Sequence, residues 1–365
     1  LPYIETVHDR VVLEVYRGCI RGCRFCQAGM VYRPIREKSP EVLCRYARSL
    51  YENTGYDEIS LISLSISDYS RLDELTDGLL SWTDEEKVSI SLPSLRVDSF
   101  TEELMNKIST VRTGGLTFAP EAGTQRLRDA INKNVEEEDL LRAVNIAFAA
   151  GKSSVKLYFM LGLPTEELSD LDGIAALADR VVDAFYAAPK HNRAKGVTVT
   201  ISVSCFIPKP FTPFQWEAQD DLETLEEKQQ YLLKKITNRR VKYHYHDARV
   251  SRIEAVFARG DRRLSAALEM ACEEGIVFDA WDEYFDYEKW ISIFSRCGID
   301  PAFYANRRFG DDEVLPWDIL DCGVTRAYLA RERERAYRNQ TTPNCAEHCN
   351  GCGANCLGGK NRWCK

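Results

Sequence analysis

Three cysteines lie close together near the start of the chain. Cys19, Cys23 and Cys26 have the spacing Cys-x3-Cys-x2-Cys, and Phe25 precedes the last of them. Thiolates this close can bind three irons of a four-iron cluster and leave the fourth iron without a protein ligand. Electron-transfer clusters normally have four cysteines, whereas an open position can bind a substrate or cofactor, as open catalytic zinc sites do. The spacing therefore favours a catalytic cluster, with a zinc site or unligated thiols as the alternatives.

A second group of cysteines lies at the end of the chain. Cys345, Cys349 and Cys352 repeat the first spacing, Cys356 brings the group to four, and Cys364 offers another thiol. Four thiolates suit either a second iron–sulfur cluster or a structural zinc ion, and disorder is the third possibility. Bound metal would fold a tail that has little core of its own.

Composition excludes several classes of protein. The chain has 365 residues and 44% hydrophobic content, enough for one large domain and a smaller one. Its net charge of -8 disfavours a broad nucleic-acid-binding surface. No apolar run reaches about 18 residues, so we expect no membrane association. Cysteines grouped for metal binding favour a reducing, cytoplasmic location, and the first residue, Leu1, suggests a piece of a longer protein.

Short apolar runs alternate with helical patterns in the first part of the chain. Six runs are predicted to be strands: 11–16, 58–64, 88–92, 115–119, 154–160 and 197–203. Strands that alternate with helices form parallel βαβ units with right-handed crossovers. A complete eight-unit barrel usually needs about 250 residues, so the sequence predicts an α/β fold with a partial (β/α)6 TIM-like barrel.

The remaining segments differ from this pattern. A mostly helical C-terminal extension is predicted to follow the barrel, and a cysteine-rich tail ends the chain. The alternating Arg and Glu of Thr325 to Arg338 predict a solvent-exposed helix. The expected organisation is a linker over 1–10, the partial barrel over 11–236, the helical extension over 237–340 and the metal-binding tail over 341–365.

The turns after the predicted strands are candidates for a binding site. Barrels of this kind place their chemistry at the carboxyl ends of the strands. Ser65 and Ser67 follow the second strand, and Glu121 follows the fourth. Gly162 follows the fifth strand, and Phe206 follows the sixth. Because these turns lie on one rim of the predicted barrel, we expect them to surround the cysteine loop.

Cys19, Cys23, Phe25 and Cys26 together resemble the signature of the radical S-adenosylmethionine (radical SAM) enzymes. The resemblance implies a 4Fe-4S cluster whose open iron binds the methionine part of SAM. It also implies reductive cleavage of SAM to a 5′-deoxyadenosyl radical, which abstracts hydrogen from a substrate. A reductant such as flavodoxin or ferredoxin is the implied partner.

The resemblance also implies roles for the residues at the strand ends, and it identifies no catalytic side chain. The positions are Ser65 and Ser67 for the SAM amino group, Glu121 for the ribose hydroxyls, Met160 and Gly162 beside adenine, and Phe206 and Ile207 closing the adenine pocket. The turn from Gly162 to Glu166 resembles one in the methylthiotransferase branch. Methylthiolation of RNA or protein is therefore an alternative function.

Other stretches narrow the resemblance. The run from Cys26 to Pro34, the run from Ala258 to Leu264, and the cysteine-rich tail are similar to bacterial cobalamin-binding-domain radical SAM proteins of uncharacterised function. Those proteins carry an N-terminal cobalamin-binding domain, which would be missing here, and the chain contains no Asp-x-His-x-x-Gly motif. One predicted outcome is cobalamin-assisted methyl transfer with that missing domain as partner. The alternative from another class is a non-catalytic iron–sulfur or zinc protein.

Overall fold

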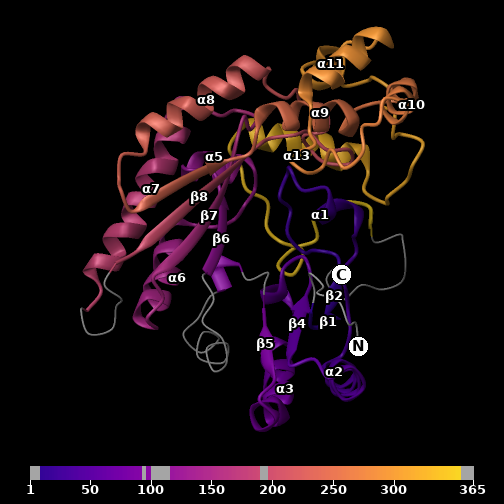
Figure 1. Ribbon diagram of the computed structural model, residues 1–365. Helices are drawn as coiled ribbons and strands as arrows, with labels where there is room; N and C mark the ends of the chain where they lie inside the picture. The colour runs from indigo at the N-terminus through magenta and orange to yellow at the C-terminus, as the bar shows by residue number, and fades with distance from the viewer. Residues whose placement is uncertain (1–8, 93–95, 100–115, 190–195, 355–365) are drawn as a thin grey trace.

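Seven parallel strands form two sheets in the part of the chain that the computed structural model describes, residues 9–92, 96–99, 116–189 and 196–354 (Figure 1). The fold class is α/β, as the sequence predicted. The strands of the two sheets are β1 (Val11–Glu14), β4 (Glu58–Ile62), β5 (Ser89–Ser91), β6 (Leu116–Glu121), β7 (Ser154–Leu161), β8 (Thr198–Cys205) and β9 (Val241–Tyr245).

The smaller sheet has the strand order β1-β4-β5. Val11 pairs with Ile59 and Glu58 pairs with Ser89, both in parallel register. Two helices, α2 (Pro40–Thr54) and α3 (Leu72–Glu86), pack their apolar faces against the sheet. The Ser39 hydroxyl accepts a hydrogen bond from the Val42 N–H and caps α2.

The larger sheet has the strand order β6-β7-β8-β9. Burial alternates along β7, which places every second side chain of this strand in the core. The outer face of the sheet is covered by α6 (Glu137–Ala149), α7 (Leu168–Ala187) and α8 (Leu222–Lys235), as Figure 1 shows. Because capping boxes begin both α6 and α7, their first turns are fixed close to the sheet.

The C-terminal region adds a helical layer after β9. Its core joins α9 (Ala248–Ala258), α10 (Ser265–Glu273), α11 (Tyr287–Arg296) and α12 (Pro301–Ala305). The other helices are the short α1 (Ala28–Val31), α5 (Gln125–Ala130) and α13 (Arg326–Tyr337), with single 3₁₀ turns at Ile66–Asp68, Val97–Ser99 and Arg262–Leu264. None of the helices described is long and apolar enough to cross a membrane.

The structure modifies two sequence-based expectations. The strand β9 lies in the segment predicted to be mostly helical, and it extends the parallel sheet past β8. The prediction that Thr325–Arg338 is solvent-exposed is wrong for one face, because Tyr328, Glu332 and Arg333 are buried. Charge alternation indicated exposure, but the buried charges on α13 have opposite charges facing them from other elements.

A close backbone approach fixes the turn that follows β6. A Cβ at Gly123 would lie 2.3 Å from both the Asp170 carbonyl oxygen and the Ile174 nitrogen of α7. Only glycine therefore lets this turn, which also carries Glu121, lie directly on the first turns of α7.

We expect Gly123→Ala to lower the free energy of unfolding by about 1–3 kcal/mol, because α7 must move to accept the methyl group. Urea denaturation followed by circular dichroism measures the change. Gly310→Ala is the matched control, since its Cβ would meet nothing closer than 3.7 Å. Equal stability of the two variants would contradict the close approach.

Candidate functional site

The loop that carries Cys19, Cys23 and Cys26 leaves the sheet at the end of β1. A two-stranded antiparallel ribbon, β2 (Tyr16–Arg17) with β3 (Arg36–Glu37), closes the base of the loop. Gly18 has a φ of +92°, and a Cβ there would lie 2.7 Å from the Tyr32 carbonyl oxygen. A glycine before Cys19 is therefore required for the chain to turn from the ribbon into the loop.

A cavity of about 290 Å³ opens at the three cysteines. It lies at the carboxyl ends of strands from both sheets, where the sequence predicted the site. The lining residues are Cys19, Arg21, Cys23, Phe25, Cys26, Leu64, Ser65, Arg96, Val97, Thr117, Phe118, Ala119, Glu121, Lys133 and Val135.

The thiols in this cavity are shielded from water. Burial raises the pKa of the Cys19 thiol to about 12, and the neighbouring Cys23 adds to the rise. Burial likewise raises the pKa of Cys26, although the Lys133 ammonium opposes the rise. Thiols of this kind stay protonated at neutral pH unless a bound metal stabilises their thiolates.

A chain of charged side chains lies beside the thiols. Arg21, inside the cysteine loop, donates from Nε to Asp68 at 2.9 Å, and its Nη1 lies 3.2 Å from Asp98. Arg96 donates to the other oxygen of Asp98 at 2.9 Å. The alternating charges fix the orientation of Arg21 and connect the loop to the ends of two strands.

Glu121 lies in the cavity, as predicted, and its backbone is strained. Its φ of +69° is rare for a residue with a side chain, and strain of this kind is concentrated at functional sites. The carboxylate forms an ion pair of 3.0 Å with Lys133. Lys133 is held by a turn in which both neighbours, Asn132 and Asn134, also have positive φ.

The two predicted serines have different surroundings. Ser65 lines the cavity, its carbonyl accepts from the Tyr16 hydroxyl, and its own hydroxyl is buried without a hydrogen-bond partner in the described residues. Ser67 does not line the cavity, because its hydroxyl accepts from the Arg96 N–H at 3.1 Å. An orphaned buried hydroxyl is a position where a polar ligand group fits.

The predicted adenine-side residues line a second cavity, also about 290 Å³. Met160, Phe206 and Ile207 lie here, at the ends of β7 and β8, and Phe25 borders both cavities. Gly162 lines neither cavity, because its N–H donates to the buried Glu166 carboxylate at 2.9 Å. Its structural role is to turn the chain after β7 with a φ of +78°.

The far side of the cysteine loop is held by a buried ion pair. The Arg24 side chain, 0% exposed, lies 3.1 Å from the Glu332 carboxylate of α13. It also donates to the carbonyl oxygens of Ala130 at 2.9 Å and Gln340 at 2.7 Å. The C-terminal helix is therefore part of the support of the loop, although more than 300 residues separate the two charges.

The tail cysteines lie against the same support. The Cys345 N–H donates to the Ile20 carbonyl at 3.0 Å, and the buried Cys352 packs in a core with Met30. Arg33, also buried, donates to the Gly29 and Arg21 carbonyls of the loop and to the Tyr328 hydroxyl. The predicted ligand Cys356 and the alternative Cys364 lie outside the described residues.

No three His, Cys, Asp or Glu side chains within the described residues converge tightly enough to hold a single metal ion. The thiolates of an iron–sulfur cluster bind separate irons, so they surround a volume instead of meeting at one point. The cavity at Cys19, Cys23 and Cys26 offers that volume together with three thiols and nearby cations.

The sequence analysis missed several residues of the site. Lys133 and Arg96 line the cavity, yet both come from segments with no recognised motif. The Asn-Lys-Asn run at 132–134 was a usable signal, because asparagine is the residue that most readily adopts positive φ after glycine. The Arg24–Glu332 pair had no local signal.

Comparison with known proteins places this site in a family. The model of the radical SAM superfamily matches residues 13–178, which include the three cysteines of the loop. The uncharacterized protein MJ0966 of Methanocaldococcus jannaschii is 33% identical over 288 residues, which are 79% of this chain and 60% of that protein. The putative methylthiotransferase MJ0865 of the same organism is 26% identical over 181 residues, covering 48% of this chain and 39% of that protein.

The chain thus spans less than two thirds of the length of both curated relatives. Among solved structures, it is similar to the radical SAM methyltransferase TsrM from Kitasatospora setae, described with cobalamin and a [4Fe-4S] cluster bound. The identity is 13%, the TM-score is 0.45, and the match covers 57% of this chain and 38% of that one.

We expect Glu332→Gln to lower the free energy of unfolding by about 3–5 kcal/mol, because it leaves the Arg24 charge buried beside a neutral amide. Urea denaturation gives the value. Glu334→Gln on the same helix is the control: its partner Arg338 lies 3.9 Å away, both side chains are 67% exposed, and the expected loss is below about 1 kcal/mol. Equal losses would show that the buried pair does not support the fold.

Proposed function

Because residues 13–178 of this chain belong to the radical SAM superfamily, we propose that the chain is an enzyme that cleaves SAM reductively at Cys19, Cys23 and Cys26. The observation that carries the proposal is the cavity in which those three thiols meet Ser65, Glu121 and Lys133. When bound, a reduced 4Fe-4S cluster supplies the electron that splits SAM to methionine and a 5′-deoxyadenosyl radical, which takes a hydrogen atom from the substrate.

The residues of the first cavity suit the polar half of SAM. The orphaned Ser65 hydroxyl can accept a hydrogen bond from the amino group, and the Lys133 ammonium is the nearest cation to Glu121 and Cys26. Glu121 can accept from both ribose hydroxyls, and the bond to an ionised acceptor is strong and directional. Its ion pair with Lys133 keeps the carboxylate charged and oriented before SAM arrives.

The second cavity suits the adenine ring. Met160, Phe206 and Ile207 give it apolar walls, and Phe206 is held edge-on against Phe214 with ring centroids 5.8 Å apart. Phe25 lies between the cysteines and these walls, since it lines both cavities. A SAM molecule along this path would be shielded from water by buried side chains, which protects a radical from side reactions.

The tail is proposed to hold a second metal centre on Cys345, Cys349, Cys352 and Cys356, either an iron–sulfur cluster or zinc. Its support is the buried Arg33, whose charge lies close enough to Cys345 to stabilise the thiolate. The same guanidinium donates to two carbonyls of the first cysteine loop. Metal in the tail would therefore strengthen the wall behind that loop.

The reaction outcome has two candidate forms. Similarity to a putative methylthiotransferase supports methylthiolation of RNA or protein. In the described residues beyond Tyr245, all regular elements are helices, so the β-barrel expected of an RNA-directed branch has no counterpart there. The sequence has no Asp-x-His-x-x-Gly motif, so cobalamin-assisted methyl transfer would need a cobalamin site from outside these 365 residues.

We expect Cys23→Ala to lose one cluster's complement of iron and to form no 5′-deoxyadenosine from SAM after anaerobic reconstitution and reduction with dithionite. Cys44→Ala is the control, because Cys44 packs against the core of the smaller sheet and lies outside the site. Iron analysis and liquid chromatography give the two readouts. Full iron content in Cys23→Ala would refute the ligand assignment, and intact SAM with the wild-type protein would refute the function.

We expect Glu121→Gln to weaken SAM binding about tenfold, or about 1.4 kcal/mol, because a neutral amide accepts more weakly from the ribose hydroxyls. Anaerobic equilibrium dialysis with the reconstituted protein measures the dissociation constant. Glu138→Gln, at an exposed position in the first turn of α6, should leave it unchanged. Unchanged affinity in Glu121→Gln would remove this residue from the binding site.

A further inference from the structure

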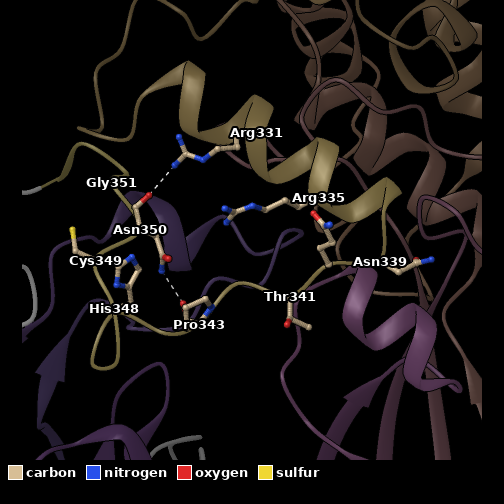
Figure 2. A pocket seen from close by; sticks show the side chains of 10 residues that line it. Arg331, Arg335, Asn339, Thr341, Pro343, His348, Cys349, Asn350 and Gly351 are labelled. Atoms are coloured by element: carbon tan, nitrogen blue, oxygen red, sulfur yellow. Dashed lines mark hydrogen bonds between the residues drawn. The ribbon is translucent and has the colours of Figure 1, made fainter.

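A wide, open concavity of about 860 Å³ lies between α13 and the tail. Figure 2 shows Arg331 and Arg335 extending from α13 toward the segment that carries His348 and Asn350. The two arginines are four residues apart and therefore lie on one side of the helix. The complete lining is Arg331, Arg335, Asn339, Gln340, Thr341, Pro343, His348, Cys349, Asn350 and Gly351.

The concavity is basic in a chain that is acidic. Its lining contains two arginines and a histidine and no carboxylate. Arg331 donates to the Asn350 carbonyl at 2.8 Å and lies over the Tyr328 ring, and no ion pair of Arg331 occurs among the described residues. Residues 326–365 carry eight Lys or Arg and three Asp or Glu, whereas the whole chain has a net charge of -8.

One carboxylate is shared by two arginines at the edge of the concavity. Glu332 accepts from Arg335 at 2.9 Å on one oxygen and from Arg24 at 3.1 Å on the other. The single negative charge cannot neutralise both guanidinium groups. A positive charge therefore remains at the concavity, and it is connected through one side chain to the cysteine loop.

The concavity lies on the opposite side of the loop from the SAM cavity. The two share no lining residue. Gln340 lines the concavity, and its carbonyl accepts from Arg24, whose backbone lies between Cys23 and Cys26. Cys349 also lines it, close to the other tail cysteines. With SAM filling the front cavity, this rear face is the short route from solvent to the first cluster.

We propose that the concavity is the docking surface for a small acidic one-electron carrier protein, of the flavodoxin or ferredoxin kind, that reduces the cluster site. The inference rests on the proposed function, which requires an electron from outside the chain. One electron passes from the reduced carrier to the cluster held by Cys19, Cys23 and Cys26, and no bond forms or breaks. A basic concavity attracts an acidic partner and speeds its arrival.

The experiment compares two reductants on the reconstituted full chain. Stopped-flow absorbance gives the rate of cluster reduction by a reduced flavodoxin and, separately, by dithionite. We expect Arg331→Glu to slow reduction by flavodoxin about tenfold at low salt and to leave the dithionite rate unchanged. The difference should shrink as salt rises, because screening weakens the attraction between the proteins.

Arg45→Glu is the matched control, since Arg45 is an exposed arginine on α2, beside the smaller sheet. It makes the same charge change and should alter the flavodoxin rate less than twofold. Arg331→Gln removes the charge but keeps a donor for the Asn350 carbonyl, so it should give an intermediate rate in a folded protein. Direct titration of the metal-free chain with oxidised flavodoxin gives a second readout, in which Arg331→Glu should weaken binding.

Each other outcome overturns the proposal. Equal slowing by Arg45→Glu would show general attraction to the whole surface, and slower reduction by dithionite would show that Arg331 acts on the loop itself. If an RNA oligonucleotide displaces flavodoxin and binds more tightly, the concavity is a nucleic-acid site. If the wild-type cluster accepts no electron from dithionite, the proposed function fails, and the titration of the metal-free chain then decides on docking alone.

Discussion

The buried ion pair between Arg24 and Glu332 is the interaction on which the site depends. Arg24 lies inside the cysteine loop, so its side chain sets the position of the backbone that carries the thiols. A guanidinium that is 0% exposed is stable only where acceptors surround it, and Glu332 together with three carbonyl oxygens provides them. The barrel strands bring the loop to the correct rim, and α13 fixes its rear wall.

Much of the fold could be predicted from local patterns. Strand positions followed from runs of β-branched residues, and helix starts from features such as Ser39-Pro40 before α2. The strand β9 was missed because Val241–Tyr245 is short, lies outside the clear alternation of strands and helices, and gains its stability from pairing with β8. Pairing between distant segments is a tertiary property that no local window contains.

The site was predictable in proportion to how closely its residues cluster in sequence. Cys19, Cys23 and Cys26 carry their spacing within one loop, and Glu121 and Ser65 lie at the carboxyl ends of strands, where chemistry is expected. Lys133 reaches the cavity through a turn of left-handed residues, and Arg96 comes from a different strand end. The face of α13 was misjudged because charge alternation does not reveal which charges will meet a buried partner.

The separation of Arg24 from Glu332 has a consequence for the biosynthesis of the protein. The partners of Arg24 include Gln340 and Thr342, so they are translated after nearly all of the chain. While the ribosome is still making α13, the loop with Cys19 has no rear wall, and a buried arginine has no counter-charge. The native loop therefore forms only once translation is almost complete, and insertion of iron into a finished site is a step that follows synthesis.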